Sequence, residues 1–224
     1  MVKETLILFT IAAGALFAGE AEDKRMEAAA TTLKEIMDIS DKAIPQDLFA
    51  KAACTVIIPG AKKGGFILAG QYGRGFASCR QPSGKGWTAP AAMRMEGGSV
   101  GFQAGGQESD IILLVMNQKG MERLTSSKFT LGGDASIAAG PVGRSTSAAT
   151  DITMRAEILS WSRSRGVFGG ISLKGSTLRP DRDVDVAIYG KAVDSKEVLQ
   201  GKVATPKAAQ ELISLLNKYS GRAN

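Results

Sequence analysis

The chain has 224 residues, of which 44% are hydrophobic, 22% are charged and 27 are glycine. This balance is typical of one globular domain with a sizeable core, and it excludes a disordered or low-complexity chain. The formal charge of +6 favours an acidic partner, but aromatic residues make up only 6% and Lys and Arg form no long run, which argues against nucleic acid.

The chain begins with a short apolar stretch behind a single lysine. The uncharged segment covers positions 5–18. It is shorter than a typical membrane span and typical of a signal-peptide core. Gly19-Glu20-Ala21 offers a small-x-small cleavage site, so we expect residues 1–21 to be a signal peptide and residues 22–224 to form one exported domain, periplasmic or secreted. A retained apolar helix, as an anchor or a buried element, is the alternative.

The next segment, up to position 44, has apolar residues at helical spacing with charged residues between them. The apolar residues are Met26, Ala29, Leu33, Ile36, Met37 and Ile44. This pattern predicts an amphipathic helix. Its polar face carries acids as well as bases, which favours packing on the domain's own sheet over lying on a membrane. Pro45 then predicts a short second helix over residues 46–52.

From Cys54 onward, short apolar runs between glycines predict β-strands. Residues 118–127 interrupt them as a short helix, and residues 205–220 predict a C-terminal helix with Thr205 as its N-cap and Pro206 at its first position. The strand patterns cover residues 54–59, 65–73, 74–80, 97–107, 110–117, 129–145, 158–176 and 184–190. We therefore predict an α+β fold, in which helices at both ends flank a glycine-rich, mostly antiparallel sheet or barrel-like sheet.

Residues 58–80, IPGAKKGGFILAGQYGRGFASCR, contain many glycines beside two lysines. A P-loop would need lysine where Phe66 stands, and a dinucleotide fingerprint starting at Gly73 would end on Ser78 instead of glycine. Neither pattern is followed by a helix, so no nucleotide cofactor is expected. We interpret the strand glycines as devices for turns, bulges and close packing: Gly70, Gly73 and Gly75.

The chain has two cysteines, Cys54 and Cys79, and no histidine. Export would permit a disulfide between them, and two buried, unpaired thiols are the alternative. No metal site is expected from this composition, and catalytic groups that require histidine are excluded. No catalytic constellation remains, and we expect no enzymatic activity and no cofactor.

Three aspartates alternate with apolar residues in PDRDVDVAIYG: Asp181, Asp183 and Asp185. A calcium loop would need glycine at Val186 and glutamate at Ala192. We therefore interpret this stretch as a strand whose acidic face lies in solvent.

Four ordered stretches resemble the SYLF domain family, which occurs in eukaryotic proteins of actin patches and phosphoinositide membranes and in bacterial exported proteins. They are the 58–80 stretch above, GWTAPAAMRMEGGSVGFQAGGQESDIILLVMN, KFTLGGDASIAAGPVGR and ILSWSRSRGVFGGISLKGS, with DVAIYG near the end. The resemblance spans roughly Met26 to Tyr219. It implies a non-enzymatic domain that binds anionic lipid head groups, and in some eukaryotic members F-actin.

Lys62 and Lys63 match the Lys-Lys-Gly-Gly segment of the family, and Arg74 matches its Tyr-Gly-x-Gly segment. We expect the two lysines to lie on an exposed hairpin turn and to contact anionic phospholipid, together with Arg74, Arg80 and Lys85 if all five share one face. Solvated surface charge is the alternative interpretation of these five residues. A protein partner in the cell envelope is the alternative function.

Overall fold

The computed structural model describes residues 2–39, 43–65, 68–100, 105–142, 155–164, 167–168 and 173–221. Its helices are α1 (Val2–Asp38), α2 (Gln46–Lys51), α3 (Gln118–Leu124), α5 (Arg182–Tyr189), α6 (Ser195–Leu199) and α7 (Gln210–Tyr219), with the 3-10 turn η2 (Lys207–Ala209) before α7. Its strands are β1 (Cys54–Gly65), β2 (Leu68–Cys79), β3 (Ala91–Val100), β4 (Gly105–Val115), β5 (Phe129–Thr130), β6 (Ile137–Ala139), β7 (Ile158–Ser164), β8 (Val167–Phe168) and β9 (Thr177–Pro180).

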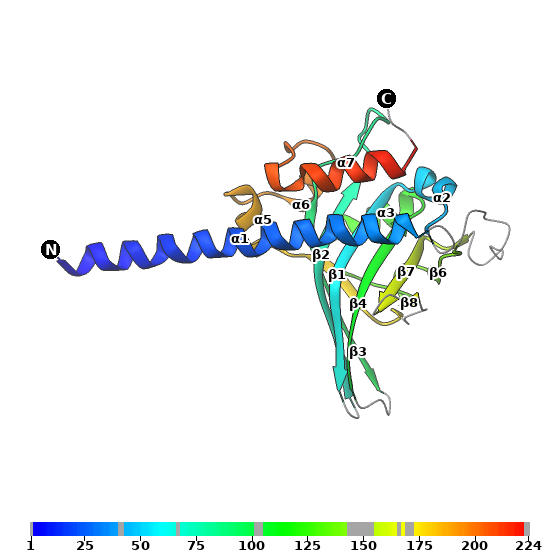
Figure 1. The fold of residues 1–224 in the computed structure, drawn as a ribbon, viewed down its shortest axis with the longest axis horizontal. Helices are drawn as coiled ribbons and strands as arrows, with labels where there is room; N and C mark the ends of the chain where they lie inside the picture. Colours follow the sequence, from blue (N-terminus) through cyan, green and yellow to red (C-terminus); the bar gives the residue numbers. More distant parts are fainter. Residues whose placement is uncertain are drawn as a thin grey trace.

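Among the described residues, nine strands form one sheet in the order β5-β9-β3-β2-β1-β4-β7-β6, with β8 paired to β7. Each ladder is antiparallel apart from the parallel pair β6 and β7. The sheet curls into a half-barrel, and α1 and α7 lie together on one face of it (Figure 1). The predicted α+β class with helices at both ends is confirmed.

Side chains alternate between the two faces of each long strand, so the sheet has an apolar core on either side. On the helix face, Ile57, Phe76 and Ile112 pack beneath α1 and α7. On the opposite face, Val56, Met93 and Leu113 share a core with residues of α3 and α6. The near-continuous apolar run at the start of β1 follows from burial on both faces.

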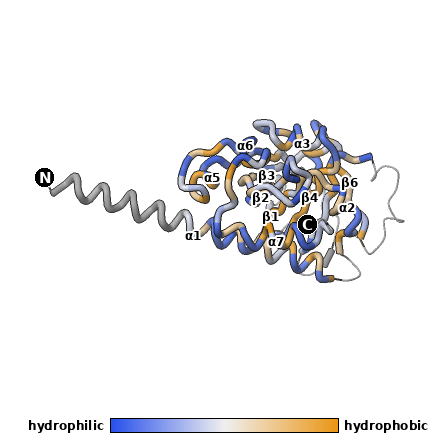
Figure 2. Tube along the Cα trace, turned by 90° about the horizontal axis from the view of Figure 1, so that it is seen from above, coloured by the Kyte–Doolittle hydropathy of each residue, from blue (hydrophilic) through white to orange (hydrophobic). Residues whose placement is uncertain are grey.

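Helix α1 is held on the sheet by one apolar stripe. Met26, Ala29, Ala30, Leu33 and Ile36 are each at most 1% exposed. Their spacing is that of one face of a helix, and the tube of α1 alternates between hydrophilic and hydrophobic colours within the sheet-covering part (Figure 2). The prediction that this helix packs on the domain's own sheet is confirmed.

The expected signal peptide falls within α1, whose described part begins at Val2. In the portion of the chain that the structure describes, no helix contains a stretch long and apolar enough to cross a membrane.

Two glycines of β2 are required by the close approach of β1. A Cβ atom on Gly75 would lie 1.9 Å from the carbonyl oxygen of Ile57, and one on Gly73 would lie 2.6 Å from the side chain of Ile58. The register of β1 shifts at this point, with Gly60 at a φ of 57°. The packing interpretation is thus confirmed for Gly73 and Gly75, whereas a Cβ atom on Gly70 would meet no atom within 4 Å, so Gly70 needs no such explanation.

Cys54 and Cys79 are direct cross-strand partners in the β1–β2 ladder. Their sulfur atoms form a disulfide, and their Cα atoms are 3.9 Å apart. Both residues are fully buried in the core opposite the helices. The sequence left a disulfide and two unpaired thiols as alternatives, and the structure contains the disulfide.

Three local predictions were wrong. Residues 62–65 are the last part of β1 and not a hairpin turn, and β2 is one continuous strand where the sequence suggested two. The predicted strand over residues 97–107 is divided between β3 and β4. These errors share one cause, because glycine marks turns in many proteins but here permits the close packing of long strands.

The acidic stretch predicted as a strand is instead helix α5. Asp181 occupies its N-cap position, acids fill its first turn, and Gly190 ends it with a φ of 67°. These start and stop signals outweigh the two-residue alternation of a segment only eight residues long. The C-terminal helix was predicted correctly but begins later, at Gln210, after Pro206 and η2.

Asp185 on α5 is fully buried and joins three elements. It accepts hydrogen bonds from the backbone N–H of Ala92 on β3, at 2.7 Å, and from the hydroxyl of Ser195 on α6, at 2.8 Å. Burial raises the pKa of Asp185 to about 6 despite these two bonds, and the nearby charge of Asp181 acts in the same direction. The solvated acidic face expected here is therefore wrong for Asp181 and Asp185.

The Cys54–Cys79 bridge closes a loop with a sequence separation of 25 residues. We expect no free thiol in secreted protein that is unfolded without reductant. Chain-entropy estimates for a loop of this length give about 3 kcal/mol, so reduction should lower the free energy of unfolding by that amount. Thiol titration and denaturant unfolding with and without reductant measure both. Two titratable thiols in the unreduced protein would contradict the bridge.

Asp185→Asn should change how stability depends on pH. An acid whose pKa is raised on folding stabilises the folded state below its unfolded pKa, and this contribution is lost as pH rises through the folded value. On folding, the pKa of Asp185 rises from its usual 3.8 to about 6. As the pH rises over that interval, the free energy of unfolding of wild type should fall by up to roughly 3 kcal/mol relative to that of the Asn variant. Urea unfolding between pH 4 and pH 7 tests this, with exposed Asp183→Asn as the control. Parallel profiles for wild type and Asp185→Asn would refute the assignment.

Candidate functional site

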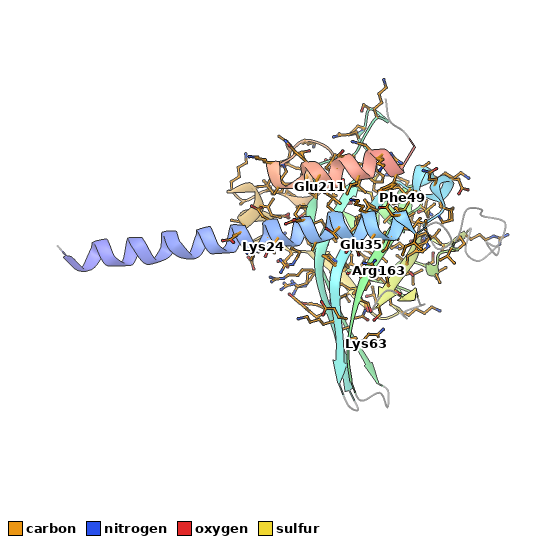
Figure 3. The ribbon with its side chains drawn as sticks, in the orientation of Figure 1. Lys24, Glu35, Phe49, Lys63, Arg163 and Glu211 are labelled. Atoms are coloured by element: carbon orange, nitrogen blue, oxygen red, sulfur yellow. A yellow bond between two sulfur atoms is a disulfide. The ribbon has the colours of Figure 1, made fainter. Side chains whose placement is uncertain are left out.

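The four central strands extend beyond the helices that cover the sheet (Figure 1). In the ladder, Lys62 pairs with Tyr72 and Glu108, and Tyr72 pairs with Glu96. We define the free end of the sheet as the residues from this row outward: 62–65, 68–72, 96–100 and 105–108. Lys63 lies near this end, below α1 in the view of Figure 3.

Lys62 and Lys63 point to opposite faces of the free end. Ala61 belongs to the core opposite the helices. Because strand side chains alternate, Lys62 then faces the helix side and Lys63 the other side. Lys62 is exposed and Lys63 half-buried. No single face of the sheet therefore presents both lysines, and they share a common surface only at its free end.

A hollow of about 650 Å³ adjoins the lysines along β1 and β4. It continues into a second hollow beside α1, with Glu108, Asp110 and Arg163 shared by the two. Among the described residues, neither Lys62 nor Lys63 forms an ion pair. The lysines are therefore the free cations of a groove in which Arg163 and Asp110 are paired with each other.

Arg163 supplies the main pairing in this groove. Its guanidinium donates to Asp110 on β4 at 2.9 Å and to Glu35 on α1 (Figure 3). Three segments distant in sequence thus meet in one cluster that fixes α1 to the sheet. No local motif marks these residues, so the sequence alone does not predict the cluster.

Arg80 is held by partners within the protein. Its guanidinium lies 4.2 Å from the ring centre of Trp87 and donates to the carbonyl oxygens of Phe49, Ala50 and Ala52. It also donates to the hydroxyl of Ser220 at 3.0 Å. Carbonyls at the C-terminal end of a helix attract a cation, so Arg80 joins α2 to the β2 end as a structural residue.

Arg74 and Lys85 are also separated from the lysines. Arg74 Nε lies 3.0 Å from Oδ2 of Asp181, which is 1% exposed, so this cation is paired inside the protein. Lys85 is exposed in the loop after β2, at the opposite end of that strand from the partners of Lys62. Seven strand residues at about 3.3 Å each place roughly 23 Å between the two ends. The expectation that all five cations share one face is wrong.

A row of arginines on the helix face was not anticipated from the sequence. Arg74 on β2, Arg94 on β3 and Arg179 on β9 are successive cross-strand partners. Arg179 donates two hydrogen bonds to Glu96, at 3.1 and 3.2 Å, and these bonds lower the pKa of the Glu96 carboxyl. Only the strand register brings these residues together, and a single sequence does not reveal it.

The described residues include no group of three His, Cys, Asp or Glu side chains that could hold a metal ion. The site instead contains exposed lysines at the free end of the sheet and a row of paired arginines on its helix face. Such cations are suited to binding anions.

Comparison with known proteins identifies the relatives of the chain. A family model described as "Ysc84: Las17-binding protein actin regulator" matches residues 96–219. SH3 domain-containing YSC84-like protein 1 of Rattus norvegicus is 31% identical over 198 residues, covering 86% of this chain and 58% of the relative. Its Xenopus laevis counterpart is 32% identical over 199 residues, covering 86% and 59%. Protein YSC84 of Saccharomyces cerevisiae is 32% identical over 180 residues, covering 79% and 38%.

The chain thus spans little more than half the length of the vertebrate relatives and less of the yeast one. The family match covers residues from the free end of β3 to the end of α7, and the relatives extend the similarity over most of the remaining chain. On this similarity, the chain belongs to the Ysc84 family, whose domain is also called SYLF.

Proposed function

We propose that this chain is a non-enzymatic binding module that docks on anionic phospholipid through the free end of the sheet. The observation that carries the proposal is the position of Lys62 and Lys63. They are unpaired among the described residues and lie at an end that the helices leave uncovered, whereas Arg74 and Arg80 are held by internal partners.

The geometry favours an approach with the free end toward the membrane. Lys62 and Lys63 project from opposite faces, so only this orientation brings both ammonium groups to one surface. Each basic residue near an anionic bilayer contributes on the order of 1 kcal/mol. Two lysines alone give weak, salt-sensitive attachment, supported by the overall charge of +6.

The apolar stripe of α1 is not part of the proposed contact. Leu33 and Ile36 are fully buried against the sheet, and an interfacial helix would have to expose such residues to lipid. Undocking α1 would also break the contact between Glu35 and Arg163. The proposal therefore assigns membrane contact to the sheet and a structural role to α1.

A protein partner is the second candidate function. It is supported by the family description, which names a Las17-binding actin regulator.

In the proposed exported location, periplasmic or secreted, the ligand would be an anionic phospholipid of the envelope. Residues 1–21 would then be a signal peptide and residues 22–224 the binding domain.

Lys62→Glu together with Lys63→Glu should abolish flotation with vesicles of phosphatidylcholine and phosphatidylglycerol, because both cations at the contact become anions. Wild-type binding should weaken steeply between 0.1 M and 1 M salt, as the Debye length falls from about 10 Å to about 3 Å. Thermal stability should change little, since exposed charges contribute little to folding.

A matched control is Lys85→Glu with Lys202→Glu, which makes the same charge change at two exposed residues near the opposite end of β2. This control should retain binding. If both double variants lose binding equally, net charge and not the free end is responsible. If Lys62→Glu, Lys63→Glu binds like wild type, the free end is not the contact.

Leu33→Ala and Ile36→Ala should each cost about 2–5 kcal/mol of stability.

Export predicts a definite mature mass. Protein recovered from the native host should lack residues 1 to about 21, because a short apolar core followed by small residues is a substrate for signal peptidase. Intact-mass measurement decides this, and a mass that includes the apolar segment would contradict cleavage.

A further inference from the structure

The arginine row contains more positive charge than its acids compensate. Arg74, Arg94 and Arg179 are directly opposite one another on adjacent strands, where like charges destabilise a sheet. Two carboxylates serve the three guanidinium groups, namely Asp181 and Glu96. One cation in the row therefore lacks a matching anion.

Arg94, in the middle, is the least satisfied of the three. Its Nε lies 3.3 Å from Glu96 and 3.8 Å from Asp181, whereas Arg74 and Arg179 approach their acids to 3.0 and 3.1 Å. Among the described residues, the Nε atoms of Arg74 and Arg94 and both carboxylate oxygens of Asp181 are buried and make no hydrogen bond of good geometry, although Arg74 Nε lies 3.0 Å from Asp181 Oδ2. The row is therefore held by charge and not by well-aligned hydrogen bonds, which is costly inside a protein.

A hollow of about 330 Å³ opens at this position. Arg94, Arg179 and Pro180 line it from the sheet, Ser127 from the segment after α3, and Asp181, Arg182 and Asp183 from the start of α5. No side chain caps α5, so its first N–H groups and the positive end of its dipole lie at the same place. The volume is near the lower limit for small-molecule sites and suits a compact ligand.

These groups together specify the ligand chemistry. Planar guanidinium groups bind phosphate oxygens through paired hydrogen bonds, and uncapped helix N-termini bind the same anion. A singly protonated phosphate also donates one hydrogen bond, which the carboxylate of exposed Asp183, lining the hollow, can accept. The second pKa of a phosphate ester is near 6, so such a proton is readily held beside a carboxylate.

We propose that this hollow, formed by Arg94, Arg179, Ser127 and the start of α5, is a binding site for a phosphate monoester group. The group belongs either to a soluble ester or to a lipid such as phosphatidic acid. The site is separate from Lys62 and Lys63, so it does not depend on the lysine contact. Phosphate binding neutralises the surplus charge of the row.

The first test measures binding of inorganic phosphate to the full chain by equilibrium dialysis, and its effect on the melting temperature at constant ionic strength. Wild type should bind saturably, with one phosphate per chain, and melt at higher temperature with phosphate. Sulfate, which carries no proton at neutral pH, should bind at least tenfold more weakly. Arg94→Gln should lose at least tenfold in phosphate affinity, and Lys85→Gln, with the same charge change, should behave like wild type.

The Arg94→Gln variant should fold well, because Arg74 with Asp181 and Arg179 with Glu96 remain as balanced pairs. In phosphate-free buffer its melting temperature should equal or exceed that of wild type. A large loss of stability there would show that Arg94 is required for packing and would overturn the surplus-charge argument. Equal phosphate binding by wild type and Arg94→Gln would overturn the site.

Vesicles distinguish the two sources. If the group belongs to a lipid, Arg94→Gln should weaken binding to vesicles containing phosphatidic acid, a monoester, but not to those containing phosphatidylglycerol, a diester. If it belongs to a soluble ester, Arg94→Gln should alter phosphate binding alone. The Lys62→Glu, Lys63→Glu protein should still bind inorganic phosphate, so failure of the lysine contact and failure of this site give different results.

Discussion

Burial of one apolar stripe of α1 against the central strands is the interaction on which the other features depend. Met26, Leu33 and Ile36 complete the helix-side core, and Glu35 of the same helix reaches the ion pair of Arg163 with Asp110. Deleting one such buried apolar side chain typically costs about 2–5 kcal/mol. A helix docked this firmly belongs to the fold, and its apolar face is not available to a membrane.

The same docking determines which surface remains for a partner. The helices cover one part of the long strands, and the strands continue beyond them into the free end that carries Lys62 and Lys63 (Figure 1). Arg80, by contrast, is held internally by Trp87 and Ser220, and Lys85 is exposed but lies at the opposite end of β2. A basic composition therefore does not by itself make a basic binding surface, and the distinction requires the partners of each cation.

The sequence predicted the features that local patterns encode. Helical spacing predicted the docked part of α1, apolar runs predicted β1 and β4, and the two cysteines proved to be cross-strand partners. It could not predict α5, because acids in the first turn and Gly190 at the end compete with a two-residue alternation over a short segment. Nor could it predict the arginine row or the fate of Arg74 and Arg80, since strand register and distant contacts decide both.

Hydrogen exchange of the wild-type protein, with and without vesicles that contain phosphatidylglycerol, tests the central claim most directly. The account predicts that vesicles slow exchange of the backbone amides at residues 62–65, 69–72, 97–100 and 105–108, while amides of α1 between Met26 and Ile36 exchange equally slowly in both conditions. Faster exchange along α1 on vesicles, with no protection at the free end, would show that the helix undocks to bind lipid and would contradict the account.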